Sequence, residues 1–239
     1  MRVSVVIPVR DGERYLMAAL DSVLVQDPRP DEMIVVDDGS TDDTAALLTE
    51  RSAPVRSVRQ EPRGQAAALN RGIEESTGDV IGFCDADDLW APGKQARQLA
   101  VLRSDPECDG VFGLVQQFVS DELDRAAGFS HAGDEPLAAR LLASTLIRRE
   151  VFDRVGSFDE TLRHGANIDW MSRASQLGVR FVALGDVVVH RRLHESNMGL
   201  LEQERARADL LEAMRRDRHR RVHNGHASGT SAGPMTAPR

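Results

Sequence analysis

The amino-acid sequence predicts an α/β fold in which helices flank a mostly parallel sheet. Short apolar runs of strand length alternate with segments whose apolar residues recur at helical spacing. This alternation implies right-handed crossovers between parallel strands. The 239 residues, of which 41% are hydrophobic, are also enough to bury a substantial core. Ligands of such sheets bind beyond the carboxyl ends of the strands.

Strands and helices are expected in strict alternation through the first part of the chain. The strands are expected at residues 3–9, 33–36, 55–58 and 80–84, and the helices at 13–26, from 44 to about 51, at 65–76 and from beyond 92 to 104. The second helix follows Ser40-Thr41-Asp42-Asp43, which has the spacing of a capping box with Asp in place of the usual Glu or Gln.

The rest of the chain has a less regular pattern. We expect an extended segment at 110–120, a loop rich in Asp, Glu, Gly and Ala at 121–136, helices at 137–142, 149–155 and 169–177, a turn at 156–159 and a strand at 179–190. A charged helix over about 200–221 and a disordered tail at 224–239, rich in Gly, Ser, Ala, Thr and Pro, are expected to follow.

Composition and charge narrow the class of protein. The net charge of −8 argues against nonspecific nucleic-acid binding. No apolar stretch approaches the ~20 residues of a membrane helix, and Cys84 and Cys108 are too few for a disulfide framework. We therefore expect a cytoplasmic protein without a transmembrane segment. Peripheral contact of the Arg-rich stretch 205–221 with anionic lipid is a weaker alternative to a solvated helix.

Carboxylates gather directly after two of the expected strands. Asp37-Asp38 follows the second strand and Asp85-Ala86-Asp87-Asp88 follows the fourth, so both groups are expected at one edge of the sheet. An Asp-x-Asp sequence at a strand end offers hard oxygen ligands suited to Mg²⁺ or Mn²⁺ held jointly with substrate phosphates. The competing interpretations are solvated turn residues before a helix, and, for the first group, a tight turn with a helix cap.

Four stretches in this order resemble the family 2 glycosyltransferases with the GT-A fold: "VSVVIPVRDGERYLMAALDSVLVQ", "EMIVVDDGSTDDT", "GQAAALNRGIEESTGDVIGFCDADDLWAPGK" and "IRREVFDRVGSFDETL". The resemblance covers roughly residues 1–200. It implies a single Rossmann-like domain with a nucleotide-binding half at 1–104 and an acceptor-side half at 105–200. A C-terminal helical extension at 201–223 and the tail at 224–239 would follow.

The resemblance implies a site for a nucleotide-sugar donor at the strand ends. Its residues are Pro8, Val9, Arg10, Asp38, Asn70, Arg71, Asp85, Ala86, Asp87, Arg191 and Arg192. Within this set, Asp38 would contact uracil, whereas Asp37 would be structural. Asn70 and Arg71 would reach the ribose or diphosphate, with a polar helix face as the competing interpretation.

The resemblance also implies a bound Mn²⁺ or Mg²⁺. Asp87 would bind the cation, Asp85 would touch the ribose or a metal-bound water, and Asp88 would support the metal from outside. The late stretch "VVVHRRLHESN" is similar to a family motif whose basic residues close over the diphosphate. It contributes Arg191, Arg192, His194 and Asn197, of which His194 is a candidate metal or phosphate ligand.

The implied reaction is transfer of the sugar, with inversion, from a donor such as a UDP-sugar to a saccharide, lipid-linked, peptide or small-molecule acceptor. The family usually supplies a base from Glu-Asp at the start of the helix after the Gly-x-Phe-Asp turn, where this sequence has Ala166 and Asn167. Asp169 is the nearest carboxylate, but residues two apart on a helix point about 200° away from each other. Asp169 is the first candidate base and His164 the second. The competing role for Asp169 is a first-turn acid behind Asn167 as N-cap.

Four functional hypotheses follow from these residues. The first is an active transferase that uses Asp169 or His164 as base. The second is a transferase whose acceptor is already anionic, such as a phosphate, and needs no base. The third is a nucleotide-sugar-binding module that has lost transfer activity and acts through a partner. The fourth and weakest is a nucleotidyltransferase, since the sequence has no Gly-rich triphosphate loop.

Overall fold

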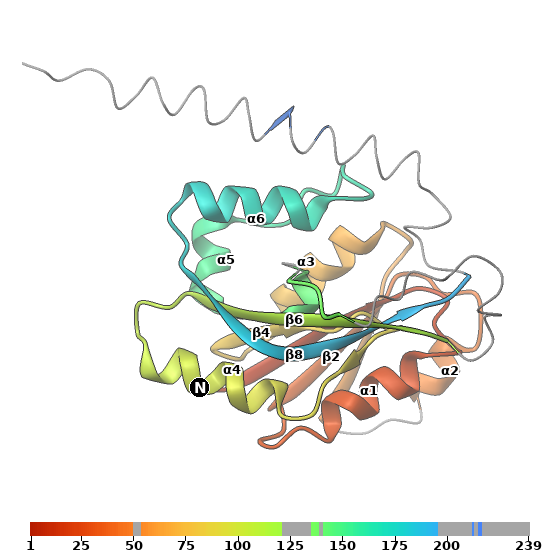
Figure 1. The fold of residues 1–239 in the computed structure, drawn as a ribbon. Helices are drawn as coiled ribbons and strands as arrows, with labels where there is room; N and C mark the ends of the chain where they lie inside the picture. The colour runs from red at the N-terminus through yellow and green to blue at the C-terminus, as the bar shows by residue number, and fades with distance from the viewer. Residues whose placement is uncertain (50–53, 121–134, 139–140, 196–211, 213–214, 217–239) are drawn as a thin grey trace, which may run out of the picture.

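An eight-stranded sheet runs through the computed structural model, which describes residues 1–49, 54–120, 135–138, 141–195, 212 and 215–216 (Figure 1). The strand order in this described part is β3-β2-β1-β4-β7-β6-β8-β5. The strands are β1 (Val3–Val9), β2 (Glu32–Asp37), β3 (Val55–Arg59), β4 (Val80–Phe83), β5 (Leu89–Trp90), β6 (Gly110–Val119), β7 (Thr145–Arg148) and β8 (Phe181–Leu193).

The first four strands pair in parallel, as the sequence predicts. β1 lies between β2 and β4, with Val6 beside Ile34 on one side and Phe83 on the other. The carboxyl ends of β2 and β4 therefore reach the same edge of the sheet, on either side of β1. Beyond β4 the sheet is mixed, because β7 is antiparallel to both β4 and β6 while β6 and β8 are parallel.

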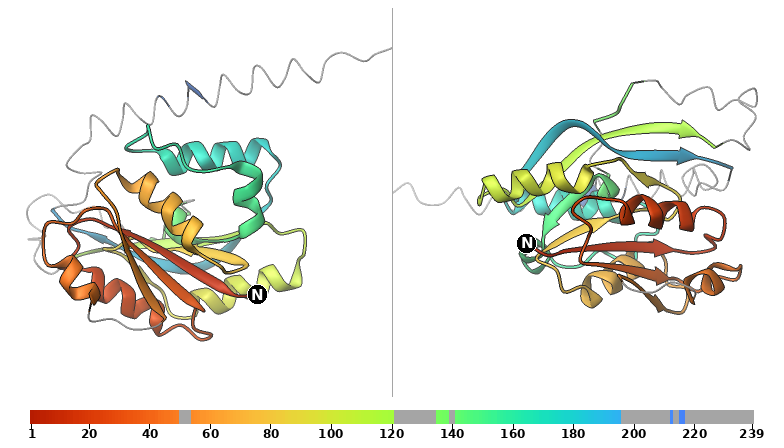
Figure 2. Two further views of the ribbon diagram at one scale, coloured as in Figure 1. Left: turned by 180° about the vertical axis from the view of Figure 1, so that it is seen from behind. Right: turned by 90° about the horizontal axis from the view of Figure 1, so that it is seen from below.

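Helices cover both faces of the sheet (Figures 1 and 2). One face carries α1 (Leu16–Leu24), α2 (Thr44–Thr49) and α4 (Lys94–Ser104). The other carries α3 (Gln65–Glu75), α5 (Arg149–Val155) and α6 (Ala166–Gln176). Each face has its own buried apolar cluster, because the parallel strands are apolar on both sides. Trp170 of α6 stacks on Phe152 of α5, with ring centroids 4.9 Å apart.

The structure corrects several expected boundaries. A helix at 137–142 is wrong, because Leu137 pairs through its main chain with Val115 and a short 3₁₀ helix covers Leu142–Ser144. The two-residue strand β5 was not expected. α1 starts at Leu16 rather than residue 13, and β8 extends to Leu193 rather than ending at 190.

α6 begins three residues earlier than the pattern predicts. Gly165, with a φ of 83°, takes the N-cap position, and Ala166 is the first helical residue. Because only glycine adopts this backbone region at no steric cost, Gly165 determines where the helix starts. An N-cap role for Asn167 is therefore wrong, and Asn167 lies in the first turn of the helix.

Some expected segments lie outside the described residues. They are most of the loop at 121–136, the tail at 224–239 and, apart from residues 212, 215 and 216, the charged helix at 200–221. In the part that the structure describes, none of the helices has the length and apolar character needed to cross a membrane.

Candidate functional site

Residues 85–88, here called the acidic loop, carry three carboxylates and form a tight turn between β4 and β5. The turn closes through a hydrogen bond from the Asp88 amide to the Asp85 carbonyl at 3.1 Å. The buried Trp90 fixes the start of the loop, since its indole Nε1 donates to the Phe83 carbonyl at 2.9 Å. The three carboxylates are thus held close together by the fold itself.

Their crowding raises the pKa of two of the three carboxyl groups. Burial, with repulsion from Asp87, raises the pKa of Asp85 to about 6, against the opposing charge of Arg191. Burial, with repulsion from Asp85 and Asp87, raises the pKa of Asp88 to about 8. Each raised pKa means that the ionised carboxylate is disfavoured in the protein alone. A cation placed among these groups would favour their ionised forms.

The end of β8 closes over the acidic loop from the opposite side. The Arg192 amide donates to Asp88 Oδ1 at 2.8 Å, and Arg192 Nε donates to the Asp87 carbonyl at 3.1 Å. The buried His194 ring has its Nε2 3.0 Å from Asp87 Oδ2. The structure thus brings together residues 100 positions apart that the sequence assigns to one site. Asn197 lies outside the described residues.

The acidic loop and His194 fit a cation that a ligand helps to hold. The side chain of Asp87 is one-third exposed and faces an imidazole nitrogen. Carboxylate oxygen suits Mn²⁺ or Mg²⁺, whereas an imidazole nitrogen suits a transition metal better than Mg²⁺. Among the described residues, no group of three or more His, Cys, Asp or Glu side chains is placed to hold a metal alone. Mg²⁺ sites built from one or two carboxylates commonly complete their shell with substrate phosphates and water.

The carboxylates of the other acidic group, Asp37-Asp38, accept hydrogen bonds from groups of the protein. Asp38 is 4% exposed. Its Oδ1 accepts from the Arg63 amide and from Gln60 Nε2, both at 2.8 Å, and its Oδ2 accepts from the Gly64 amide at 2.7 Å. Asp38 therefore fixes the loop at residues 60–64 that leads into α3, and its contact with uracil stays a prediction.

Asp37 is likewise engaged by groups of the protein. Its Oδ1 accepts from the Ser40 amide at 2.8 Å, and its Oδ2 pairs with Arg59 at 2.9 Å. These bonds close the Asp-Asp-Gly-Ser turn and tie it to β3. The arrangement agrees with the structural role expected for Asp37.

The end of β1 lies between the two acidic groups. Pro8 pairs with Val36 in the sheet, Val9 is buried beside Asp37, and Arg10 is exposed. Arg10 Nε is 3.8 Å from the carboxylate of Asp11. Their predicted position near the nucleotide base is compatible with this placement and stays a prediction.

Asn70 and Arg71 make their hydrogen bonds away from the acidic loop. The side-chain amide of Asn70 accepts from the Phe158 amide at 2.8 Å and donates to the Phe158 carbonyl at 3.0 Å, so it bonds both main-chain groups of that residue, as a neighbouring strand would. Arg71 pairs with Glu75 one turn along α3. Asn70 thus joins α3 to the turn before α6, and the predicted contacts of both residues with ribose or diphosphate stay predictions.

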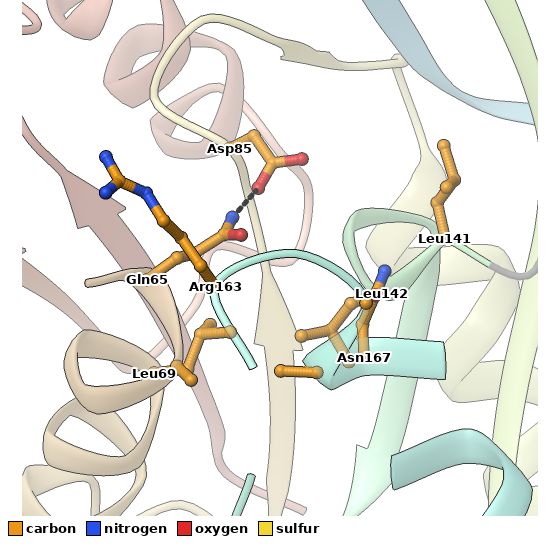
Figure 3. Close-up of a pocket in the computed structure, with 10 residues that line it drawn as sticks. Gln65, Leu69, Asp85, Leu141, Leu142, Arg163 and Asn167 are labelled. Atoms are coloured by element: carbon orange, nitrogen blue, oxygen red, sulfur yellow. Dashed lines mark hydrogen bonds between the residues drawn. The ribbon is translucent and has the colours of Figure 1, made fainter. Parts of the chain in front are cut away.

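A small cavity of about 60 Å³ adjoins Asp85 (Figure 3). Gln65 Nε2 lies 3.4 Å from Asp85 Oδ1 at its rim, and Arg163 and Asn167 contribute its other polar side chains. The apolar lining comes from Leu69, Leu141, Leu142, Ala66 and Ala166, with Gly165. Sequence reasoning missed Gln65 and Arg163. The position of Gln65 at the N-terminus of α3, at the same sheet edge, was the signal that could have found it.

Asp169, the first candidate base, is paired with Arg173 and is not among the ten residues that line this cavity. Its carboxylate is 3% exposed and accepts from Arg173 Nε at 2.9 Å. Arg173 also donates to the Ser157 carbonyl at 2.7 Å, so the pair links α6 to the end of α5. His164, the second candidate, is half-buried directly before Gly165. A catalytic role for either residue stays a prediction.

A family model described as glycosyl transferase family 2 matches residues 4–156 of the chain. An uncharacterized glycosyltransferase of Nostoc is 39% identical over 108 residues, which cover 44% of this chain and 34% of that protein. The succinoglycan biosynthesis protein ExoU of Rhizobium meliloti is 29% identical over 256 aligned positions, covering 91% of this chain and 75% of that protein. The chain spans about a third of the Nostoc relative and about two thirds of a similar Rickettsia typhi protein.

Solved structures of S. aureus TarS share the fold. One superposes with a TM-score of 0.66 at 20% sequence identity and covers 91% of this chain and 39% of that chain. A TarS structure in complex with UDP-GlcNAc gives a TM-score of 0.65 at 21% identity and covers 82% of this chain and 60% of that chain. These likenesses confirm the α/β fold with a helix-flanked sheet that the sequence predicts.

Proposed function

The chain belongs to glycosyl transferase family 2, and from this premise we propose that it transfers a sugar from a nucleoside diphosphate donor to an acceptor, with inversion at the anomeric carbon. The observation that carries the proposal is the acidic loop, whose crowded carboxylates face Arg191, Arg192 and His194 at the carboxyl edge of the sheet. A UDP-sugar is the favoured donor, because a TarS structure with the same fold is a complex with UDP-GlcNAc.

The proposed donor site joins the acidic loop to the basic end of β8. A Mn²⁺ or Mg²⁺ ion, when bound, would neutralise charge on the carboxylates and on the donor's diphosphate. Asp87 and His194 would hold this ion, with Asp85 nearer the ribose or a bound water. Arg191 and Arg192 would attract the diphosphate as it leaves, since guanidinium groups bind phosphate oxygens well.

The transfer also needs a way to remove the acceptor's proton. The candidates are Asp169 and His164, and the ion pair of Asp169 with Arg173 would have to open for Asp169 to act. We propose Asp169→Asn, assayed for turnover and for stability, as the test. Loss of a general base lowers turnover by roughly 10²–10⁴-fold. A stability loss with turnover within tenfold of wild type would assign Asp169 to structure, and the buried pair favours this result.

A second version of the function needs no base. In the part of the chain that the structure describes, Asp85 is the only carboxylate lining the cavity, and Arg163 and Asn167 also line it. These residues suit an acceptor whose oxygen is already anionic, such as a phosphate. A phosphate-bearing acceptor should then be used at a rate that is flat between pH 6 and 8, and its uncharged alcohol counterpart should not be used.

The proposed function is tested by a thermal-shift panel of UDP-, GDP- and dTDP-sugars, each with and without Mn²⁺. A ligand at 100 times its dissociation constant stabilises the folded protein by about 2.7 kcal/mol. We expect a Mn²⁺-dependent shift with at least one donor, followed by release of its nucleoside diphosphate when acceptor is supplied. If no donor gives a metal-dependent shift, the proposed donor site is refuted. Tight binding without transfer or hydrolysis would instead favour a binding module that has lost activity.

A further inference from the structure

We propose that Tyr15, at the start of α1, is a positioning residue that holds Arg192 and His194 against the acidic loop. Through them it would set the affinity of the site for a divalent cation bound together with a nucleoside diphosphate. The inference rests on the proposed function, because it concerns the same donor site. Tyr15 is the single tyrosine of the sequence, and it lies 177 positions before Arg192.

Tyr15 contacts both residues through its ring. The His194 ring lies with its centroid 4.6 Å from that of Tyr15, at an interplanar angle of 43°. The Arg192 guanidinium carbon is 4.7 Å from the Tyr15 centroid and also 4.7 Å from the Phe118 centroid. The guanidinium of Arg192 therefore lies within cation–π distance of two aromatic rings and is attracted to the face of each.

Both side chains that touch Tyr15 go on to touch the acidic loop. His194 Nε2 lies 3.0 Å from Asp87 Oδ2, and Arg192 Nε donates to the Asp87 carbonyl at 3.1 Å. The Tyr15 ring thus limits the rotation of the imidazole and the guanidinium that face Asp87. Residues that orient a metal ligand from outside commonly change metal affinity by roughly 10–100-fold when removed.

The loop that carries Tyr15 is itself fixed by Ser40 of the Asp-Asp-Gly-Ser turn and by Thr44 at the start of α2. Ser40 Oγ accepts from the Asp11 amide at 2.9 Å, and Thr44 Oγ1 accepts from the Gly12 amide at 2.8 Å. The Gly12 carbonyl then accepts from the Tyr15 amide at 3.1 Å. A Cβ at Gly12 would lie 2.4 Å from a methyl of the preceding strand, so the close approach requires glycine. Tyr15 is therefore presented by a rigid main chain.

Phe118 provides a matched comparison with Tyr15. Its ring centroid also lies 4.7 Å from the Arg192 guanidinium carbon. Among the ring contacts of the described residues, Phe118 has none with His194. Removing the Phe118 ring therefore loosens Arg192 alone, whereas removing the Tyr15 ring loosens both Arg192 and His194. Both rings are half-buried, so their truncation leaves the core intact.

The test is calorimetric titration of UDP into the full chain, with and without Mn²⁺, for wild type, Tyr15→Leu, Tyr15→Phe and Phe118→Leu. The quantity compared is the Mn²⁺-dependent gain in UDP affinity. We expect Tyr15→Leu to reduce this gain by roughly 10–100-fold, and to lower UDP affinity without Mn²⁺ by a smaller factor, because Arg192 faces the diphosphate in both conditions. Tyr15→Phe keeps the ring and should match wild type, and Phe118→Leu should fall between them.

The same titrations separate failure of this inference from failure of the proposed function. A wild-type protein whose UDP affinity does not respond to Mn²⁺ would overturn the metal-dependent donor site, before any variant is considered. A normal wild-type gain that persists in Tyr15→Leu, or that falls equally in Tyr15→Leu and Phe118→Leu, would overturn the role of Tyr15. An equal loss with and without Mn²⁺ would also overturn it, because that result indicates a general structural defect. Should Tyr15→Leu fail to fold, Tyr15→Met gives the same comparison with an unbranched side chain.

Discussion

The two acidic groups at the carboxyl edge of the sheet share a place at the end of an apolar strand but have opposite surroundings. Asp38 is buried and accepts three hydrogen bonds from residues 60–64. The acidic loop at 85–88 has three carboxylates that repel one another, and the pKa of Asp85 and of Asp88 is raised as a result of burial and this repulsion. Both groups directly follow strands that flank β1.

This difference shows what separates a structural carboxylate from a candidate cation site. The carboxylate of Asp38 accepts hydrogen bonds from main-chain amides of the loop at residues 60–64, which lies outside the Asp-Asp-Gly-Ser motif. The acidic loop receives an amide hydrogen bond to Asp88 from β8 and an imidazole beside Asp87 from the residue after β8, and these do not offset the burial and mutual repulsion that keep the pKa of Asp85 and Asp88 raised. We therefore place the proposed cation at the acidic loop, and not at Asp38.

Replacement of Asp87 by asparagine is the change with the largest expected effect. It removes the proposed metal-binding charge, so the affinity for UDP in the presence of Mn²⁺ should fall by at least about 100-fold. Calorimetric titration measures the change, and Asp43→Asn, at an exposed aspartate, is the control. Unchanged affinity in Asp87→Asn would place the cation elsewhere.

Replacement of Asp38 by alanine should act mainly on stability. The Arg63 and Gly64 amides would lose their acceptor, which costs roughly 1–3 kcal/mol of the free energy of unfolding. Urea denaturation monitored by tryptophan fluorescence measures this loss. Asp38→Asn should lose less, because the amide keeps one acceptor oxygen. If Asp38→Ala abolishes the Mn²⁺-dependent part of UDP binding, the assignment of the cation to the acidic loop and not to Asp38 is contradicted.

The raised pKa values predict how the stability of the ligand-free protein depends on pH. With a folded-state pKa of about 8 for Asp88 and about 6 for Asp85, the folded protein binds more protons than the unfolded chain above pH 4. Stability contributed by these groups is therefore lost as the pH rises toward 8. We expect a decrease of roughly 2–3 kcal/mol between pH 6 and 8 in urea denaturation, because each pH unit in which the folded protein keeps a proton that the unfolded chain has lost costs about 1.4 kcal/mol. Asp88→Asn should flatten this slope, and an equal slope in the variant would refute the assignment.

The smallest effect is expected at the exposed surface of the loop at residues 60–64, which Asp38 holds. Arg63 pairs with Glu160 at 2.6 Å, but the Arg63 side chain is 61% exposed. Such pairs contribute about 0.2–1 kcal/mol. A double-mutant cycle with Arg63→Gln and Glu160→Gln measures this coupling by urea denaturation. A coupling well above 1 kcal/mol would mean that the side chain of Arg63, rather than Asp38, holds the loop.

The sequence predicts the half of the fold that positions these acidic groups. Apolar runs long enough for only one strand, separated by amphipathic helices, were sufficient to predict β1 to β4 and their parallel orientation. The shared edge of Asp38 and Asp87 followed from that orientation, whereas the strand order was not predicted. The mixed part of the sheet was harder to predict from the sequence, because β5 has two residues and is defined only by its pairing with β8.

Side-chain partners could not be predicted from local patterns. The acceptors of Asn70 and the donors to Asp38 lie in turns, and hydrogen bonds to main-chain groups of turns leave no periodic signal. The predicted start of α6 was three residues too late, because Gly165 adopts a positive φ that the sequence permits but does not require. The contact of Tyr15 with Arg192 and His194 joins the start of α1 to the end of β8, so it depends on the complete fold.

The central claim is that the acidic loop, rather than the Asp38 group, binds one divalent cation together with a nucleoside diphosphate. Anomalous scattering from crystals grown with Mn²⁺ and UDP tests it most directly. The account predicts one manganese peak within coordination distance of the Asp87 carboxylate and of the diphosphate. Crystals that contain UDP and either lack a peak at the acidic loop or show the peak at Asp38 would contradict it.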